Sequence, residues 1–121
     1  MSTPCIIAVK TEEGCQAIYC HFDGYSDYMW PLLNEHYNSE ELARSIVALG
    51  DASYITEKLW PNSHYHSFSN PEPGVSIFYH RDRGEPWDFV KPELYESEFK
   101  LLGLQPYIYV FMNGHWEELC A

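Results

Sequence analysis

The first two apolar stretches of the sequence have the residue spacing of β-strands. Residues 5–10 are rich in β-branched side chains, and residues 16–23 alternate between apolar and polar positions. Because neighbouring side chains of a strand point to opposite faces, the second stretch has one apolar and one polar side. The apolar side consists of Ile18, Cys20 and Phe22, and the polar side consists of Tyr19, His21 and Asp23. A polar turn ending at Gly14 separates the stretches, which predicts an N-terminal β-hairpin with its apolar side facing the core.

The next apolar positions recur with the period of an α-helix. A stripe over residues 29–37 predicts a first helix. Because proline fits only the first turn of a helix, Pro31 places the start close to Trp30, or else a kink interrupts an earlier turn. A second helix is expected between Ser39, a good N-cap, and Gly50, a good C-terminal stop. Two helices are therefore expected directly after the hairpin.

The second half of the chain alternates between loops and short regular segments. Residues 51–57 suit a short strand or a turn, and residues 60–74, rich in Pro, Asn and Ser, predict a long loop. Residues 75–80 are strand-like, and a charged turn follows at 81–86. An apolar face with a proline in the first turn predicts a third helix over residues 92–102.

Two strand-like runs at the end of the sequence, residues 107–112 and 115–119, flank Asn113-Gly114. Both turn residues tolerate positive φ, which makes this pair the strongest short hairpin signal. The elements together predict an α+β fold in a single domain, residues 1–121. Its antiparallel sheet is built from an N-terminal hairpin, a middle strand and a C-terminal Asn-Gly hairpin, with two or three helices packed on one face. The other face is left to solvent or to a partner.

Composition and charge narrow the class of partner. The 121 residues include 18 acidic and 7 basic ones, which gives a net charge of −11, and 17% are aromatic. This negative charge disfavours direct binding to nucleic acid or to an anionic membrane, because both require a positively charged protein surface. The longest apolar run, residues 5–9, is too short to span a bilayer, and no signal peptide is recognised. We therefore expect a cytoplasmic protein.

The sequence carries no motif that fixes a particular chemistry. It lacks a Gly-x-Ser-x-Gly elbow, a Gly-rich phosphate loop and a Cys-x-x-Cys pair. The cysteines are expected to be thiols, with a disulfide from Cys5 to Cys15 or Cys20 as the less favoured alternative. A zinc site could be assembled from His21, His64, His66 and Cys20. No spacing selects them, so we expect neither a metal nor another cofactor, and we assign no catalytic residue.

One group of polar and aromatic side chains is a candidate binding site. It forms if the strand ending at residue 23 lies beside the strand ending at residue 80. Its members are Tyr19, His21, Asp23, Tyr25, Tyr79, His80, Arg81, Asp82 and Arg83. Arginine on a phosphate and tyrosine stacked on a base suit a nucleotide-like ligand. The favoured alternative is a polar network that anchors the loop after the sheet, in which Asp23 and Asp82 accept hydrogen bonds.

Acidic and aromatic side chains together suggest a surface that binds proteins. Exposed Tyr and Trp beside carboxylates bind basic protein surfaces well, including those that normally hold nucleic acid. Acidic pairs such as Glu12-Glu13, Glu40-Glu41 and Glu117-Glu118 are spread along the chain. The simpler interpretation, which the charge alone favours, is that these residues keep a small domain soluble.

Four segments form a pattern in order along the chain. They are Ile18-Tyr19-Cys20-His21-Phe22-Asp23-Gly24-Tyr25, Leu32-Leu33-Asn34-Glu35-His36-Tyr37, Ala48-Leu49-Gly50-Asp51 and Tyr79-His80-Arg81-Asp82-Arg83-Gly84-Glu85. With a tyrosine-rich strand before Trp116, the pattern resembles small uncharacterised bacteriophage and prophage proteins. The resemblance implies an accessory protein made in a bacterial host cell, of a kind that binds and disables a host or defence component. It transfers no catalytic residue.

The leading hypothesis is therefore a phage-type accessory protein in the cytoplasm of a bacterial host cell. It binds and inhibits a host or defence-system protein through an acidic, aromatic-rich surface. The alternative is a binder or hydrolase of a nucleotide-like small molecule that uses the His/Asp/Tyr/Arg group. A structural role in a virion or replication complex is a third hypothesis, and a tyrosine-rich sheet face also suits a homodimer.

Overall fold

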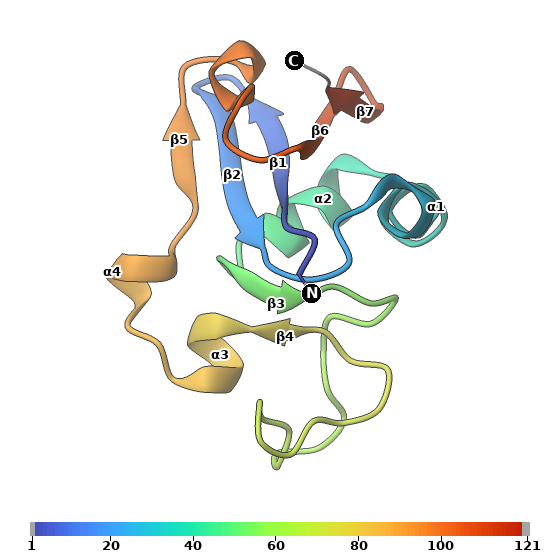
Figure 1. The fold of residues 1–121 in the computed structure, drawn as a ribbon, viewed down its shortest axis with the longest axis vertical. Coiled ribbons are helices and arrows are strands. Elements are labelled where there is room, and N and C mark those ends of the chain that lie inside the picture. The colour runs from blue at the N-terminus through green and yellow to red at the C-terminus, as the bar shows by residue number, and fades with distance from the viewer. Residues whose placement is uncertain (1, 120–121) are drawn as a thin grey trace.

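A mixed β-sheet forms the centre of the computed structural model, which describes residues 2–119. Four strands run in the order β2-β1-β6-β7 (Figure 1). Their bounds are Cys5–Thr11 for β1, Gly14–Cys20 for β2, Tyr107–Met112 for β6 and His115–Leu119 for β7. Both predicted hairpins, β1–β2 and β6–β7, are confirmed and are antiparallel.

The sheet is not antiparallel throughout, because β1 and β6 run parallel. Their register places Ile7 beside Tyr109, and both side chains are fully buried on the same face. A long connection separates the two hairpins, so the second hairpin can join β1 in either direction without strain in a turn. The direction depends on which side chains are buried together, and no local signal in the sequence reports it.

The outer edge of β2 pairs with two different strands. β5 (Glu93–Tyr95) pairs antiparallel with residues 15–17 of β2, and β3 (Ala52–Tyr54) pairs parallel with its end, at Cys20. β4 (Ile77–Phe78) then pairs antiparallel with β3. Figure 1 shows β5 leaving β2 in one direction and the β3–β4 pair in the other. The sheet therefore forks at this edge.

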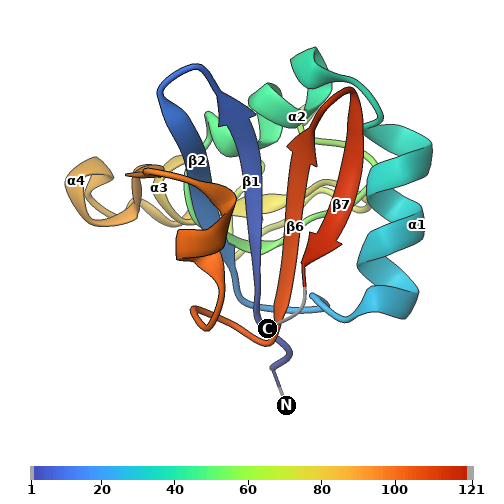
Figure 2. The same cartoon turned by 90° about the horizontal axis from the view of Figure 1, so that it is seen from above.

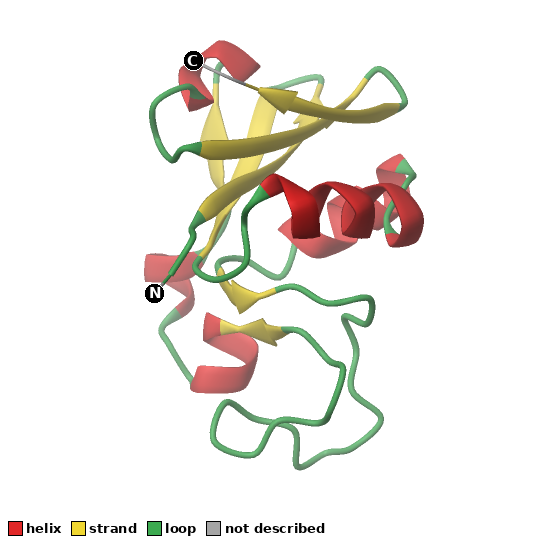
Figure 3. Ribbon diagram, turned by 45° about the vertical axis from the view of Figure 1, so that its right-hand side comes forward, coloured by secondary structure: helices red, strands yellow, loops and turns green. Residues whose placement is uncertain are grey.

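Two helices cover one face of the sheet, α1 (Ser26–His36) and α2 (Glu40–Val47) (Figure 3). The N-cap of α2 is confirmed, since the Ser39 hydroxyl accepts a hydrogen bond from the Leu42 amide at 3.1 Å. α1 begins before Trp30 and carries Pro31 inside it. The lost backbone hydrogen bond at Pro31 is offset because the helix buries Met29 and Leu33 completely in the core.

The other face of the sheet is also covered. The one-turn 3-10 helix η1 (Glu98–Leu101) places Leu101 against Ile108 and Val110, and all three are buried. In Figure 2, the orange η1 lies in front of the sheet and α2 lies behind it. The predicted third helix over 92–102 is thus wrong: its first part is β5, because the open edge of β2 binds that backbone, and only its second part is helical.

The predicted strand over residues 75–80 is cut short by a helix. β4 ends at Phe78, and α3 (Tyr79–Arg83) follows where a charged turn was expected, with α4 (Trp87–Val90) next. The Asp82 carboxylate accepts the Phe78 amide hydrogen bond at 2.8 Å, which stabilises the first turn of α3. Residues 60–74 form the predicted loop, which Figure 3 shows at one end of the molecule.

The period-two reading of β2 holds only as far as Cys20. Ile18 and Cys20 are buried as predicted, but Phe22 is 40% exposed. The chain leaves the strand at this point, and Asp23 adopts a positive φ of 60°. The alternation of side chains therefore no longer sets the direction of the Phe22 ring.

Candidate functional site

The structure divides the nine predicted binding residues among three places. Tyr19 and His21 lie at the end of β2, Asp23 and Tyr25 lie in the turn before α1, and residues 79–83 form α3. The Tyr19 hydroxyl and His21 Nδ1 are 2.6 Å apart. The two strands expected to be neighbours, β2 and β4, are not adjacent, because β3 lies between them. Burial raises the pKa of the Tyr79 hydroxyl, and the Tyr19 hydroxyl raises it further. The Tyr25 ring instead contacts Tyr28 of α1, with ring centres 6.2 Å apart.

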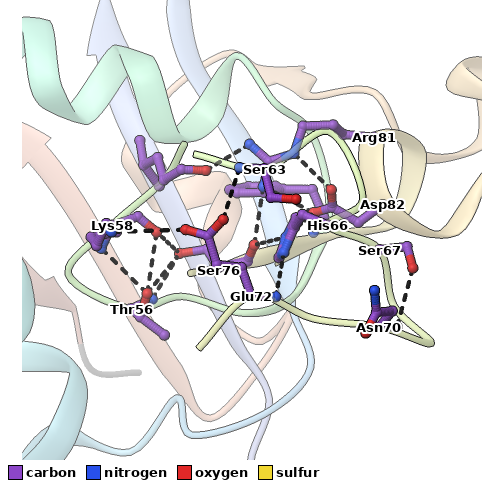
Figure 4. Close-up of polar contacts among 12 residues, drawn as sticks. Thr56, Lys58, Ser63, His66, Ser67, Asn70, Glu72, Ser76, Arg81 and Asp82 are labelled. Atoms are coloured by element: carbon purple, nitrogen blue, oxygen red, sulfur yellow. Dashed lines mark hydrogen bonds and ion pairs between the residues drawn. The ribbon is translucent and has the colours of Figure 1, made fainter. Parts of the chain in front are cut away.

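Arg81 and Asp82 form a network that ties α3 to the long loop (Figure 4). Arg81 Nε and Nη2 donate to the two Asp82 carboxylate oxygens, each at 2.9 Å. Arg81 Nη1 donates to the Leu59 carbonyl at 2.6 Å, and Nη2 also donates to the Ser76 carbonyl at 3.0 Å. The guanidinium is therefore occupied on all three nitrogens. For Arg81 and Asp82, this arrangement is the anchoring network expected as the favoured alternative.

His66 and Glu72 complete this network within the loop (Figure 4). His66 Nδ1 accepts the Glu72 amide hydrogen bond at 2.8 Å, so that nitrogen carries no proton. Its Nε2 lies 3.3 Å from the Ser76 carbonyl oxygen and 3.6 Å from Asp82 Oδ2, which favours a proton there. Two backbone amides, of Asn62 and Ser63, donate to the Glu72 carboxylate and lower its pKa.

No metal site is found in the part of the chain that the structure describes. Residues 2–119 contain no group of three or more His, Cys, Asp or Glu side chains placed to hold an ion. His64 is exposed, whereas the His66 side chain is only 1% exposed and is fully used by the network. His64 and His66 are therefore only two positions apart in sequence but have separate environments.

The cysteines of β1 and β2 are free thiols. Cys5 and Cys20 lie opposite each other in the hairpin register and are both fully buried. A hydrogen bond with Cys20 and burial together raise the pKa of the Cys5 thiol well above its usual range. Cys15 is also a buried free thiol, and Cys120 lies outside the described residues. The expectation of reduced cysteines is consistent with these three residues.

Exposed aromatic rings surround α3. The rings of Trp60 and Phe68 stack on arginines of the helix, with Arg81 5.5 Å from the centre of the Trp60 ring and Arg83 4.8 Å from that of Phe68. Arg83 also lies 4.7 Å from the centre of the Tyr79 ring, and Trp87 meets His80 edge to face. We call Trp60, Phe68, Tyr79 and Trp87 the α3 aromatic surface. Trp60 is 61% exposed and Phe68 53% exposed, so large apolar rings are held open to solvent.

Asp51 joins three elements at the fork in the sheet. Its Oδ1 accepts the Tyr19 amide hydrogen bond of β2 at 2.9 Å. Its own amide donates to the Val90 carbonyl of α4 at 2.8 Å, and its carbonyl accepts the Tyr79 amide of α3 at 3.0 Å. The carboxylate thus takes the place of a strand carbonyl at the point where the two neighbours of β2 diverge. Burial raises the pKa of Asp51 to about 6, although the Tyr19 amide opposes the change.

A cavity of about 170 Å³ opens beside Asp51, between β2, β5 and α4. Its polar lining carries three carboxylates and one ammonium, and its aromatic lining carries three rings. These residues are Asp51, Asp88, Glu93 and Lys91, and Tyr19, Phe89 and Tyr95. The sequence pattern indicated only Tyr19 among them. The cavity has an excess of negative charge, and small-molecule sites usually exceed about 300 Å³, so it does not suit a nucleotide.

Comparison of the chain with protein-family models, with curated proteins and with solved structures gives no match. Among residues 2–119, no helix combines the length and the apolar character needed to cross a membrane. The α3 aromatic surface and the cavity at the fork are the features of the described residues that bear on function.

Proposed function

We propose that the chain is a small accessory protein of phage type that binds and inhibits a host or defence-system protein. The α3 aromatic surface is the contact region, and the negative charge of the chain selects a partner with a basic surface. The observation that carries the proposal is that three exposed rings pack against one short helix: Trp60 and Phe68 stack on Arg81 and Arg83, and Trp87 meets His80 edge to face.

The stacking supports a role in binding because it holds the rings in place before any partner arrives. Tryptophan, tyrosine and arginine are the residues that most often dominate the energy of protein interfaces. Binding usually costs about 0.5–1.5 kcal/mol for each flexible side chain that it immobilises. The rings of Trp60 and Phe68 are already ordered by Arg81 and Arg83, so most of this cost is absent.

The charge of the chain supports a basic partner. The net charge is −11, and the cations of α3 are neutralised locally: Arg81 by Asp82, and Arg83 by Glu85 at 3.6 Å. The arginines of α3 therefore do not offset the negative charge of the chain, which acts on an approaching partner. The field of this charge speeds the association of a positively charged protein and makes the binding sensitive to salt.

The network around α3 favours this function over binding of a nucleotide. A phosphate ligand requires arginine donors that are free, but the Arg81 guanidinium already makes four hydrogen bonds to Asp82, Leu59 and Ser76. Releasing it would leave the buried Asp82 carboxylate without its partner, which costs several kcal/mol.

A capture experiment with matched variants tests the proposal. The tagged chain is used as bait in lysate of bacterial cells, and bound proteins are identified by mass spectrometry. We expect one stoichiometric partner, which the double variant Trp60→Ala/Phe68→Ala no longer captures. Phe99→Ala is the control, because Phe99 is 72% exposed but belongs to η1, at the opposite end of the molecule (Figure 1).

Inhibition is then measured on the purified partner. Its activity should fall to a residual level at one equivalent of the chain, and binding should weaken about tenfold or more between 0.1 and 0.5 M salt. Equal capture by the double variant and by Phe99→Ala would contradict the proposed surface, and a partner whose activity is unchanged would contradict inhibition. Light scattering on the same preparation tests the alternative use of such a surface in a homodimer.

A further inference from the structure

The cavity at the fork of the sheet is a second binding feature, separate from the stacked rings. It exists because β5 pairs with β2 only as far as Ala17, whereas β3 joins β2 only at Cys20. Between these points, the Tyr19 amide donates its hydrogen bond to the Asp51 carboxylate and not to a neighbouring strand. The edge of β2 is thereby satisfied without being covered, and the space of about 170 Å³ remains open.

Two carboxylates, of Glu93 and Asp51, give the cavity a polar lining. The Tyr95 hydroxyl donates to Glu93 Oε2 at 2.7 Å, which fixes that carboxylate against an aromatic ring. Only Oδ1 of Asp51 has a hydrogen-bond partner among residues 2–119, so Oδ2 is left to accept one. The cavity therefore offers fixed carboxylate oxygens beside tyrosine rings.

The charge of these carboxylates is not balanced within the cavity. Lys91 is the one ammonium in the described lining, and its Nζ lies 3.8 Å from Asp88 at the exposed rim. Asp51 and Glu93 remain without a cation. We propose that the cavity binds the guanidinium of an arginine side chain of the protein partner. This inference rests on the proposed function, because it requires that partner.

The size of the cavity fits one side chain. Water occupies about 30 Å³ per molecule in the liquid, so the space corresponds to about five or six water molecules. Arginine suits it better than lysine because a planar guanidinium stacks on aromatic rings and donates to two carboxylates at once. A compact ammonium makes neither contact as well.

The position of the cavity links it to the α3 aromatic surface. Phe89 lines the cavity and is two residues from Trp87 on the same short helix, α4. The one-turn helix α4 therefore contributes a residue to each feature, and a partner that spans this helix contacts both. The stacked rings supply apolar contact area, and the cavity supplies a specific polar anchor.

Binding of a small probe tests the inference without knowledge of the partner. The 15N-labelled full chain is titrated with N-acetyl-arginine amide and, as a neutral control of the same shape, N-acetyl-citrulline amide. The arginine probe should shift the amide resonances of Tyr19, Asp51 and Tyr95 and bind at least about tenfold more tightly than the citrulline probe.

Variants and pH separate the cavity from general attraction to an acidic protein. Asp51→Asn and Glu93→Gln should each weaken the arginine probe about fivefold or more, whereas Glu12→Gln, on the exposed β1–β2 turn, should not. The spectrum of each variant shows whether the chain is folded. Because a proton competes for Asp51, the affinity should fall about threefold or more from pH 7 to pH 5.

The outcomes distinguish this inference from the proposed function. Equal shifts with arginine and citrulline probes, or unchanged binding by Asp51→Asn, overturn the cavity as a guanidinium site even if a partner is captured. Loss of the partner in Trp60→Ala/Phe68→Ala with arginine binding intact supports both proposals. Binding of the arginine probe without any captured partner supports the guanidinium site, and overturns its assignment to a partner side chain.

Discussion

The position of Asp51 predicts how the stability of the protein depends on pH. The side chain is half-buried at the fork, where burial raises its pKa from 3.8 to about 6. Replacement by asparagine keeps an oxygen that accepts the Tyr19 amide hydrogen bond and removes the charge. Asp51→Asn therefore tests the electrostatic cost of this carboxylate with little change in shape.

The sign of the effect follows from proton binding. A carboxyl with a raised pKa binds a proton more tightly in the folded than in the unfolded chain, so this group lowers stability as pH rises from about 4 to about 6. Each tenfold difference in proton affinity corresponds to about 1.4 kcal/mol, which sets an upper limit of about 3 kcal/mol. Because the carboxyl is partly exposed and solvent screens it, we expect about 1–2 kcal/mol.

Urea denaturation between pH 3.5 and 8 measures the effect. The free energy of unfolding of Asp51→Asn, relative to the natural chain, should rise by about 1–2 kcal/mol across this range and level off above about pH 7. Glu12→Gln, at an exposed position in the β1–β2 turn, controls for the loss of one negative charge. Parallel curves for Asp51→Asn and the natural chain would refute the reasoning, and so would an NMR titration midpoint of Asp51 near its ordinary value.

Substitutions at three further positions test the packing of the fold around the site. Arg81→Ala removes the cation that pairs with the buried Asp82 carboxylate, and it should lower the free energy of unfolding by about 3–5 kcal/mol. Arg81→Lys should recover only part of this loss, and urea denaturation measures both variants. Gly50→Ala should lower the free energy of unfolding by about 2 kcal/mol or more, because φ is +83° and a Cβ atom would lie 2.5 Å from the Val90 carbonyl oxygen. An unchanged melting temperature of this variant would contradict the close approach. Tyr109→Phe removes a buried hydrogen bond to the Gly24 carbonyl at 2.7 Å and should cost about 1–2 kcal/mol in the same assay.

The elements that the sequence predicts correctly depend on neighbours in the chain. Alternation of side chains and the Asn113-Gly114 turn define the two hairpins, and Ser39 defines the start of α2. Strong local signals of this kind act through turn geometry and capping hydrogen bonds, which involve residues only a few positions apart. The same holds for the loop over residues 60–74, whose composition excludes a regular element.

The errors lie where a distant segment changes the outcome of a local preference. Residues 93–95 have the pattern of a helix but form β5, because β2 offers an unpaired edge. Residues 79–80 were expected to end a strand and 81–83 to form a turn, but all five form α3, where Arg81 binds the Leu59 carbonyl 22 residues away. Hydrogen bonds to a partner far along the chain outweigh propensities of a few tenths of a kcal/mol per residue.

The candidate site also has parts that the local sequence determines and parts that depend on distant segments. The sequence by itself determined the negative charge, the supply of aromatic residues and the two hairpins. It brought Tyr19 and Tyr79 into one predicted group on the assumption of neighbouring strands, but β3 lies between the two strands in the fold. Only the tertiary structure decided the fork, the cavity and the role of Asp51, whose carboxylate binds an amide 32 residues away. The physical reason is that a cavity is a space left between segments, and its existence depends on where strands stop pairing, which no single segment encodes.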